Sequence, residues 1–376
     1  MRFSIHHIIQ KQNLNLKLHF NMTSHSITNR YSKTVLFVGC AYDPPRGGVA
    51  QVLYNYKKFI FNPFNIIIDS NSGSGLCKTF VFFTALLQLC LKLIFGKYKI
   101  VHIHTSSYNS FKRSSYWVRI AKLLKKKVVL HIHGGAFKAY YETKPGWISS
   151  ILNKADHIIC LTESWKEFYS QITHDVHISV VENVISPPEI SIKDDEKSKL
   201  HALFLGLITE TKGVFDLLEV ISNNSTLLRG KFMLHIGGNG QIEKLLKIIK
   251  DNSIEDIVQY EGWVAGDRKN DLMNICDIFI LPSYAEGLPV SIIEALSYGQ
   301  YVIASNVGGI PEILPEQFGM LIEPGNKPDI KAAIDYVISH QEECVKDKIK
   351  RQSYTVHYGP KAISAKLRQV YDSLLK

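Results

Sequence analysis

The chain alternates short apolar runs with longer stretches in which apolar residues recur at helical spacing. The short runs predict buried strands, because a strand that is covered on both faces carries apolar side chains in a near-continuous series. The intervening stretches predict helices that pack on such a sheet. The expected strands occupy residues 34–39, 99–105, 128–133, 157–161 and 176–181, and then residues 202–206, 231–236, 258–263, 277–282 and 301–305.

This alternation of strand and helix occurs in both halves of the chain. Helices that connect successive strands return the chain to the same end of a sheet and make its strands parallel. A length of 376 residues also exceeds what one typical core accommodates. We therefore predict an α/β fold of two Rossmann-like, doubly wound parallel-sheet domains that face each other across a ligand-binding cleft.

Changes of composition set the expected domain boundaries. Residues 1–32 are polar, rich in His and Asn, and lack the apolar core of a signal peptide. They predict a disordered tail, in which Met22 is a second candidate for the first residue. Paired prolines and a cluster of Lys, Asp and Glu predict a linker over residues 186–198. The remaining parts are a first domain over residues 33–185, a second over residues 199–355 and a C-terminal helix within residues 356–376.

The charge is distributed unevenly between the two halves. Residues 1–185 contain 23 Lys and Arg against 8 Asp and Glu, a balance of +15, whereas residues 186–376 contain 21 against 26, a balance of −5. The first domain is therefore expected to face an anionic partner, either nucleic acid or a membrane surface. No helix-turn-helix, zinc or RNA-platform signature supports nucleic acid, so we expect no nucleic-acid partner.

The six cysteines favour a reducing compartment. They form no Cys-x-x-Cys pair, and most lie within apolar runs, where a thiol behaves as a small hydrophobic group. We expect reduced thiols and a cytoplasmic protein.

Two predicted helices of the first domain bear on a membrane partner. Residues 79–95 are mostly apolar and are interrupted by Gln88 and Lys92. These 17 residues fall short of the roughly 20 that a span needs, so we expect a helix that covers the sheet, with a helix dipping into a bilayer surface as the alternative. Residues 112–126 place Tyr116 and Trp117 opposite basic side chains, which suits either an anionic membrane interface or a solvated charged face.

Two predicted strands each carry a pair of histidines, His102 with His104 and His131 with His133. Alternation along a strand places both members of a pair on the same face, so a metal site is one interpretation. No carboxylate or cysteine lies close in sequence at a ligand spacing, and we expect no metal. His133 lies where its strand runs into Gly134, at an edge from which side chains reach a ligand crevice in open α/β sheets.

A glycine pair, Gly47 and Gly48, follows the first predicted strand and precedes a predicted helix over residues 49–60. Free N–H groups at a helix start attract anions, and glycine lets a ligand approach the backbone closely. The alternative is an ordinary tight turn.

The stretch over residues 285–296 joins a strand to a helix and carries two carboxylates. Gly287 and Pro289 favour a loop that ends in a first helical turn, so Glu286 is expected on the loop and Glu294 near the helix start. Such a helix end attracts phosphate, and carboxylates accept hydrogen bonds from sugar hydroxyls, which together suit a sugar nucleotide. The alternative is a capping box in which Glu294 satisfies a backbone donor.

From Glu286 through Glu294, and onward through Gly308 and Glu312, the sequence resembles the retaining glycosyltransferases of family 4, also called glycosyltransferase group 1. The resemblance covers roughly residues 34–375. It implies a GT-B fold, in which the first domain mainly holds the acceptor and the second mainly holds a nucleotide-sugar donor. It also implies that the last helix crosses back to the first domain.

The resemblance implies roles for residues of the second domain. Glu286 would contact the hydroxyls of the donor sugar, Glu294 would bond the nucleotide ribose, and Lys212 would neutralise the diphosphate. Backbone groups of three consecutive residues would face the donor, namely Gly287, Leu288 and Pro289.

In the first domain, the resemblance implies that Gly47 and Gly48 close over the phosphates and that His133 reaches the transferred sugar. One departure is Leu207, which stands where the family usually carries a phosphate-binding arginine. Lys212 is then expected to carry more of the charge neutralisation, with help from backbone N–H groups.

These expectations define an enzyme that moves a hexose from a nucleoside diphosphate sugar to a glycan or lipid-linked glycan, as in bacterial-type surface polysaccharide assembly. It would retain the anomeric configuration, use no metal and no cofactor besides the donor, and work in the cytoplasm, peripherally on the inner face of the membrane. Its expected catalytic residues are Glu286, His133 and Lys212. The alternatives are a sugar-nucleotide epimerase or a phosphorylase on the same fold, and a non-catalytic scaffold that binds sugar nucleotides.

Overall fold

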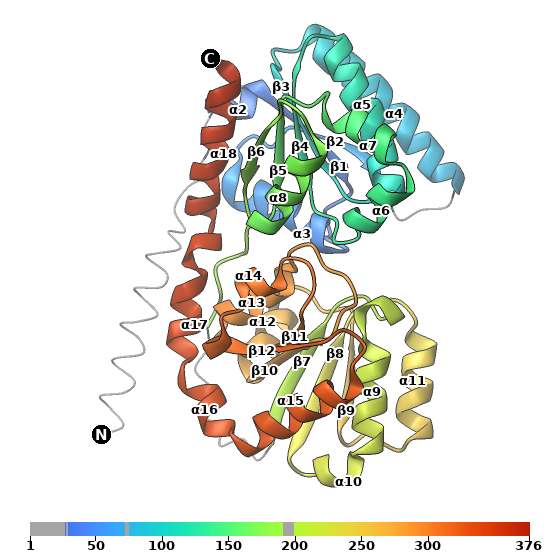
Figure 1. The fold of residues 1–376 in the computed structure, drawn as a ribbon, viewed down its shortest axis with the longest axis vertical. Coiled ribbons are helices and arrows are strands. Elements are labelled where there is room, and N and C mark those ends of the chain that lie inside the picture. Colours follow the sequence, from blue (N-terminus) through green and yellow to red (C-terminus); the bar gives the residue numbers. More distant parts are fainter. Residues whose placement is uncertain (1–26, 28, 72–74, 191–198) are drawn as a thin grey trace. The chain divides into compact units, whose positions relative to one another are not determined.

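The computed structural model describes residue 27 and residues 29–71, 75–190 and 199–376 (Figure 1). These residues form two compact units. The first unit contains the described residues up to Ser186 together with His357–Lys376, and the second unit contains the described residues of Pro187–Val356. Each unit is built on its own six-stranded parallel sheet, which confirms the predicted α/β class with two Rossmann-like sheets.

The sheet of the first unit has the order β2-β1-β3-β4-β5-β6, and all its neighbouring strands run parallel. Its interior strands are buried along nearly their whole length, which explains their continuous apolar sequence. The strands are β1 (Val35–Cys40), β2 (Ile66–Ser70), β3 (Ile100–Thr105), β4 (Lys127–Ile132), β5 (His157–Cys160) and β6 (His177–Val180).

Helices cover this sheet, and an aromatic core lies beneath them. Trp117, Phe111 and Phe137 are fully buried, and the Trp117 indole N–H donates a hydrogen bond to Asp69 over 2.9 Å. The helices are α2 (Asn29–Thr34), α3 (Gly48–Asn55) with its continuation η1 (Tyr56–Ile60), α4 (Gly75–Phe95), α5 (Asn109–Leu123), α6 (Phe137–Thr143), α7 (Pro145–Leu152) and α8 (Glu163–Ile172).

The C-terminal helix α18 (Pro360–Leu375) also belongs to the first unit, although the sequence of the second unit separates it from the rest. The hydroxyl of its fully buried Tyr371 lies 2.7 Å from Nδ1 of His102 on β3. Lys366 donates to the Glu182 carboxylate over 2.6 Å. These contacts attach the end of the chain to the first sheet.

Most of the predicted tail over residues 1–32 lies outside the described residues, but its last part is not a tail. Ile27 is buried, and its N–H donates to the carbonyl of Ile60 over 2.9 Å. Helix α2 begins two residues later. The expected boundary was therefore several residues too late, because this short segment is ordered by its contacts with η1 rather than by its own sequence. Residues 191–198 of the predicted linker also lie outside the described residues.

The sheet of the second unit has the order β12-β11-β10-β7-β8-β9, again parallel throughout. Its strands are β7 (Leu200–Leu205), β8 (Phe232–Gly237), β9 (Val258–Gly262), β10 (Ile278–Leu281), β11 (Tyr301–Ser305) and β12 (Gly319–Ile322). Its longer helices are α9 (Val214–Asn223), α11 (Ile242–Asp251), α12 (Gly266–Ile275), α13 (Val290–Ser297) and α15 (Lys327–Ser339). Shorter ones are η2 (Glu210–Lys212), α10 (Ser225–Leu228), α14 (Ile310–Ile313), η3 (Glu316–Phe318), α16 (Gln341–Lys346), α17 (Lys348–Tyr354) and η4 (Thr355–Tyr358), which crosses the boundary between the units.

The structure contains one helical segment that is long and apolar enough to cross a membrane. It is Cys77–Phe95 of α4, in a protein whose residues 1–26, 28, 72–74 and 191–198 are not described. The prediction of a helix that covers the sheet describes only one side of α4. Leu89 and Leu93 are buried in the core, whereas Phe83 and Leu87 on the other side are about 60% exposed.

Candidate functional site

The loop after β10 holds the first predicted carboxylate. Glu286 lies between the end of β10 and the start of α13, and only 9% of it is exposed. Its Oε1 accepts a hydrogen bond from Ser283 Oγ over 2.8 Å and another from Lys212 Nζ. The structure therefore places Glu286 on a strand-to-helix loop, as predicted, and brings it into direct contact with Lys212.

Lys212 reaches this position because of the glycine that follows it. Gly213 has φ of +67°, and a Cβ atom there would lie 1.9 Å from the carbonyl oxygen of Pro282. Only glycine allows this approach. A hydrogen bond from the Tyr284 N–H to the Thr211 carbonyl, 2.9 Å long, joins the same two loops.

A third loop closes on Glu286 from β11. Gly308 has φ of +56°, and a Cβ atom there would lie 1.8 Å from the carbonyl oxygen of Glu286. The N–H of Gly309 donates to the Gly287 carbonyl over 2.8 Å. The backbone of Gly287, Leu288 and Pro289 is thus held in place immediately before α13, where helix N–H groups can attract an anion.

Glu294 is the fifth residue of α13, near the helix start as predicted, but the capping-box interpretation is wrong. The helix begins at Val290 after Pro289, and no side chain caps it. Both carboxylate oxygens of Glu294 instead accept from Lys269 Nζ, each over 2.7 Å.

Sequence reasoning missed Lys269 and Ser283. Lys269 lies on α12, 25 positions before Glu294, and no local pattern connects the two. Ser283 is three residues from Glu286, a spacing that also occurs in ordinary turns. Leu207, which replaces the expected arginine, is 49% exposed in the loop after β7 and brings no charge.

The first unit carries the other predicted residues at the carboxyl edge of its own sheet. Gly47, with φ of +127°, immediately precedes α3, and Gln51 N–H donates to its carbonyl over 2.9 Å. Among the described residues, no atom outside the adjoining chain and helix backbone would lie within 4 Å of a Cβ atom at Gly47 or Gly48. The backbone at the start of α3 is therefore open to a ligand.

His133 follows β4 and is 9% exposed. Its Nδ1 lies 3.2 Å from Asn183 Oδ1, and its Nε2 lies 2.9 Å from His104 Nδ1. Because an amide oxygen only accepts, Nδ1 carries the proton and Nε2 accepts from His104. Burial lowers the pKa of His133 to about 4, so the ring is neutral near pH 7.

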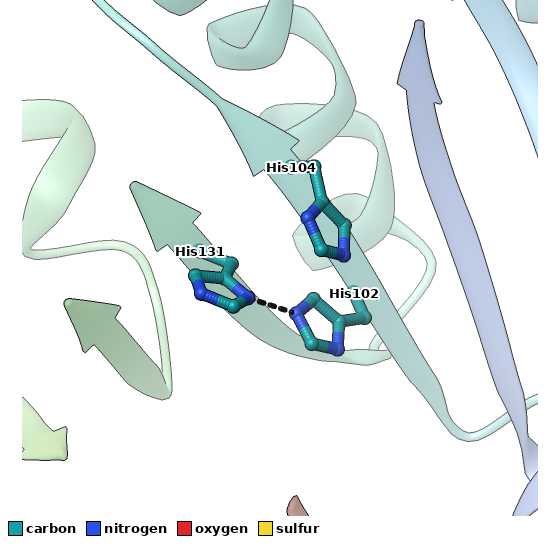
Figure 2. A group of neighbouring side chains, drawn as sticks. All are labelled: His102, His104 and His131. Carbon is teal, nitrogen blue, oxygen red and sulfur yellow. Dashed lines mark hydrogen bonds between the residues drawn. The ribbon is translucent and has the colours of Figure 1, made fainter. Parts of the chain in front are cut away.

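His102, His104 and His131 form a buried cluster (Figure 2). His104 of this cluster contacts His133. Their candidate ligand atoms lie within 4.8 Å of one another. Burial holds the pKa of each ring well below its ordinary value. His102 Nε2 lies 3.3 Å from His131 Nδ1, the contact drawn in Figure 2.

The geometry of this cluster favours a hydrogen-bonded stack over a metal site. The rings of His102 and His104 are stacked, with centroids 4.7 Å apart and planes 9° from parallel. Metal ligation requires nitrogen lone pairs that converge on one point at about 2.0–2.1 Å. Both nitrogens of His102 are already engaged, by Tyr371 and by His131.

The architecture of two Rossmann-like parallel-sheet units is that of GT-B glycosyltransferases. The structure of Anabaena HepE in complex with UDP-glucose is similar, with a TM-score of 0.72 at 15% identity over 90% of this chain and 99% of that chain. This likeness shows the fold.

Sequence comparisons name the family. Residues 62–187 match the family model described as Glycosyltransferase Family 4, and residues 188–354 match Glycosyl transferases group 1. An uncharacterized 41.2 kDa protein in the cps region of Klebsiella pneumoniae is 26% identical over 328 residues, which cover 78% of this chain and 87% of that protein. The amylovoran biosynthesis glycosyltransferase AmsK of Erwinia amylovora is 30% identical over 177 residues, covering 44% of this chain and 42% of AmsK. The chain belongs to the family 4, or group 1, glycosyltransferases.

Proposed function

We propose that this glycosyltransferase moves a hexose from a nucleoside diphosphate sugar to a hydroxyl group of a glycan or lipid-linked glycan. The observation that carries the proposal is the contact of Lys212 with Glu286 beside the start of α13. A cation and a helix start suit a diphosphate, and a carboxylate suits sugar hydroxyls. The UDP-glucose bound to HepE and the polysaccharide named for AmsK support this donor class and an acceptor in surface polysaccharide assembly.

Both carboxylates are held by lysines that a donor would attract. On donor binding, Lys212 would turn from Glu286 toward the diphosphate, because phosphate oxygens carry more charge than one carboxylate. Glu286 would then accept hydrogen bonds from the sugar hydroxyls. Lys269 and Glu294 would separate in the same way, leaving Glu294 to accept from the ribose hydroxyls.

The reaction would proceed on one face of the anomeric carbon. The bond from that carbon to the phosphate oxygen breaks as the bond to the acceptor oxygen forms, and the leaving phosphate oxygen takes the acceptor's proton. Lys212 and backbone N–H groups at the start of α13 would stabilise the departing charge. Retention then needs neither a protein nucleophile nor a metal ion.

The first unit would contribute groups from its own sheet edge. The open N–H groups at Gly47 and Gly48 would bind the phosphates. Neutral His133 would exchange the hydrogen bond between its Nε2 and His104 for one with the transferred sugar. We place the enzyme in the cytoplasm, peripherally at the inner face of the membrane, with no nucleic-acid partner and no cofactor.

Incubation of the full chain with labelled nucleotide sugars and a glycan acceptor tests the function. We expect transfer to the acceptor, with the donor's anomeric configuration retained in the product by NMR. Conversion of the donor sugar without an acceptor would indicate an epimerase, and release of a sugar phosphate from the glycan in a parallel incubation with inorganic phosphate would indicate a phosphorylase. Binding without any turnover would indicate a scaffold.

A further inference from the structure

The side of α4 that faces away from the core carries a row of large, exposed apolar side chains. At 100° per residue, the five positions of this row fall within an arc of about 80° and extend over about 21 Å. The opposite side of the helix carries Ala85, Leu89 and Leu93, which are buried in the core of the first unit. The exposed fractions along the row are 70% at Phe80, 60% at Phe83, 61% at Leu87, 47% at Leu91 and 57% at Ile94.

The inner side of α4 argues against a helix that crosses the membrane. A span would have to withdraw Leu89 and Leu93 from the core and expose the sheet beneath them. A helix with one side on its own protein and an apolar row on the other suits a position parallel to the membrane surface. The apolar row then enters the boundary between headgroups and acyl chains.

The charge around this row matches an anionic lipid surface. No Asp or Glu occurs between Asp69 and Glu142, whereas that stretch contains twelve Lys and Arg residues. Lys78, Lys92 and Lys97 lie on α4 or immediately after it. Two such faces from two copies of the chain would repel each other, which disfavours a second copy as the partner.

The neighbouring helix α5 extends the same surface. Its Tyr116 is 43% exposed, and its ring packs edge-on against Phe82 of α4 with centroids 5.7 Å apart. Lys112 and Arg119 are exposed on the same helix. Tyrosine rings and basic side chains are typical of the headgroup level of a membrane.

We propose that the α4 row and its flanking cations dock the first unit on an anionic membrane leaflet, with α4 lying in the plane of the interface. This adds a defined lipid-binding surface to the proposed function. It does not depend on the donor site, whose residues Lys212, Glu286 and Glu294 lie in the second unit.

Co-sedimentation of the full chain with vesicles tests the proposal. Vesicles of phosphatidylglycerol and phosphatidylcholine are expected to bind the protein, and binding should weaken as salt rises. The double variant Phe83→Ser and Leu87→Ser is expected to bind at least about tenfold more weakly. The matched control is Leu227→Ser with Leu246→Ser, at exposed leucines of the second unit, and it should bind as the parent does. Thermal unfolding verifies that both double variants fold.

Equal vesicle binding by the two double variants would overturn the proposal. A dimer in solution that dissociates in the Phe83→Ser and Leu87→Ser variant, without vesicle binding by the parent, would assign the row to a second copy and would also overturn it. Protein that resists extraction by alkaline carbonate would indicate a spanning helix instead. Donor binding, measured in parallel, should be unchanged in the α4 variant. If the parent binds vesicles but no nucleotide sugar, the proposed function fails while the docking surface stands.

Discussion

The two units share one sheet architecture but differ in how they treat buried polar groups. On β3 and at β4 of the first unit, burial keeps four histidines neutral and hydrogen-bonded to one another, to Asn183 or to Tyr371. At the carboxyl edge of the second sheet, Glu286 and Glu294 are each held by a lysine. A neutral stack stabilises a core, whereas an ion pair at a sheet edge can exchange its partners for a charged ligand.

The two halves of the chain also differ in net charge. The first half of the chain has a balance of +15 and a stretch of 72 residues, 70–141, without a single acid, whereas the second half has a balance of −5. The positive charge of the protein is therefore concentrated away from the unit that holds Lys212 and Glu286. This separation suits an enzyme that holds a soluble donor with one unit and approaches an anionic surface with the other.

The largest expected effect comes from the charge of Glu286. Glu286→Gln keeps an acceptor for Ser283 but removes the negative charge that Lys212 contacts, so turnover should fall about 10²- to 10³-fold. Initial rates at saturating donor measure it. Glu255→Gln, at an exposed acid of the same unit, should leave the rate unchanged. An undiminished rate in Glu286→Gln would remove the role assigned to this carboxylate.

Lowering the pH should destabilise the first unit more than the second. Burial lowers the pKa of His133 from 6.5 to about 4. Between these two pH values, His133 is protonated in the unfolded chain but neutral in the folded unit. The contribution of neutral His133 to the free energy of unfolding is fully present above pH 6.5. It is lost as the pH falls toward 4, by on the order of 3 kcal/mol for His133 alone. Hydrogen exchange at pH 7 and pH 5 should show this loss in the first unit.

A histidine variant sharpens the acid test. His104→Gln removes one titrating ring from the stack and should make the loss of stability with falling pH less steep. His340→Gln, at an exposed position of the second unit, should leave the slope unchanged. An equal loss in both units would contradict the contrast between neutral and charged interiors.

The close approach at Gly308 predicts a smaller effect. Gly308→Ala would place a Cβ atom 1.8 Å from the Glu286 carbonyl oxygen, so we expect a loss of about 2–3 kcal/mol together with weaker donor binding. Gly230 shares the positive φ, +75°, but among the described residues no atom beyond its chain neighbours would lie within 4 Å of the added Cβ, so Gly230→Ala should cost about 1 kcal/mol. Equal unfolding free energies for the two variants would show that the contact with the Glu286 loop does not matter.

The smallest predicted effect lies at the C-terminal helix. Tyr371→Phe removes the hydroxyl that lies 2.7 Å from His102 Nδ1 and leaves that buried nitrogen without this partner. We expect the first unit to lose about 1–2 kcal/mol in urea unfolding. Tryptophan fluorescence reports mainly on the unfolding of the first unit, because three of the four tryptophans lie there, namely Trp117, Trp147 and Trp165. Tyr116→Phe, at an exposed tyrosine, is the control and should change little.

The sequence predicts interior strands well because burial on both faces leaves a continuous apolar run. It misses β2 and β12, because each is short, lies at one end of its sheet and leaves at least two of its side chains only partly buried. It also treats α4 as a covering helix, because an apolar pattern reports which residues are hydrophobic and not which of them find a partner. The side of α4 that carries Phe83 and Leu87 does not pack on the core of the first unit.

The candidate site divides in the same way. Gly287 and Pro289 determine the local loop, so the positions of Glu286 and Glu294 follow from the sequence. The lysines that hold these carboxylates depend on tertiary structure. Lys269 lies on another helix, and nothing near it in the chain indicates that it meets both oxygens of Glu294.

We propose that the second unit binds a nucleoside diphosphate sugar through Lys212, Glu286 and Glu294. Thermal unfolding of the full chain with a panel of UDP-, GDP-, ADP- and TDP-sugars tests it most directly, because a ligand that binds only the folded state stabilises it by about 2.7 kcal/mol at 100 times its Kd. We predict that at least one nucleotide sugar raises the unfolding temperature, and that Lys212→Met removes most of this shift. No shift with any member of the panel, or an undiminished shift in Lys212→Met, would exclude this donor site.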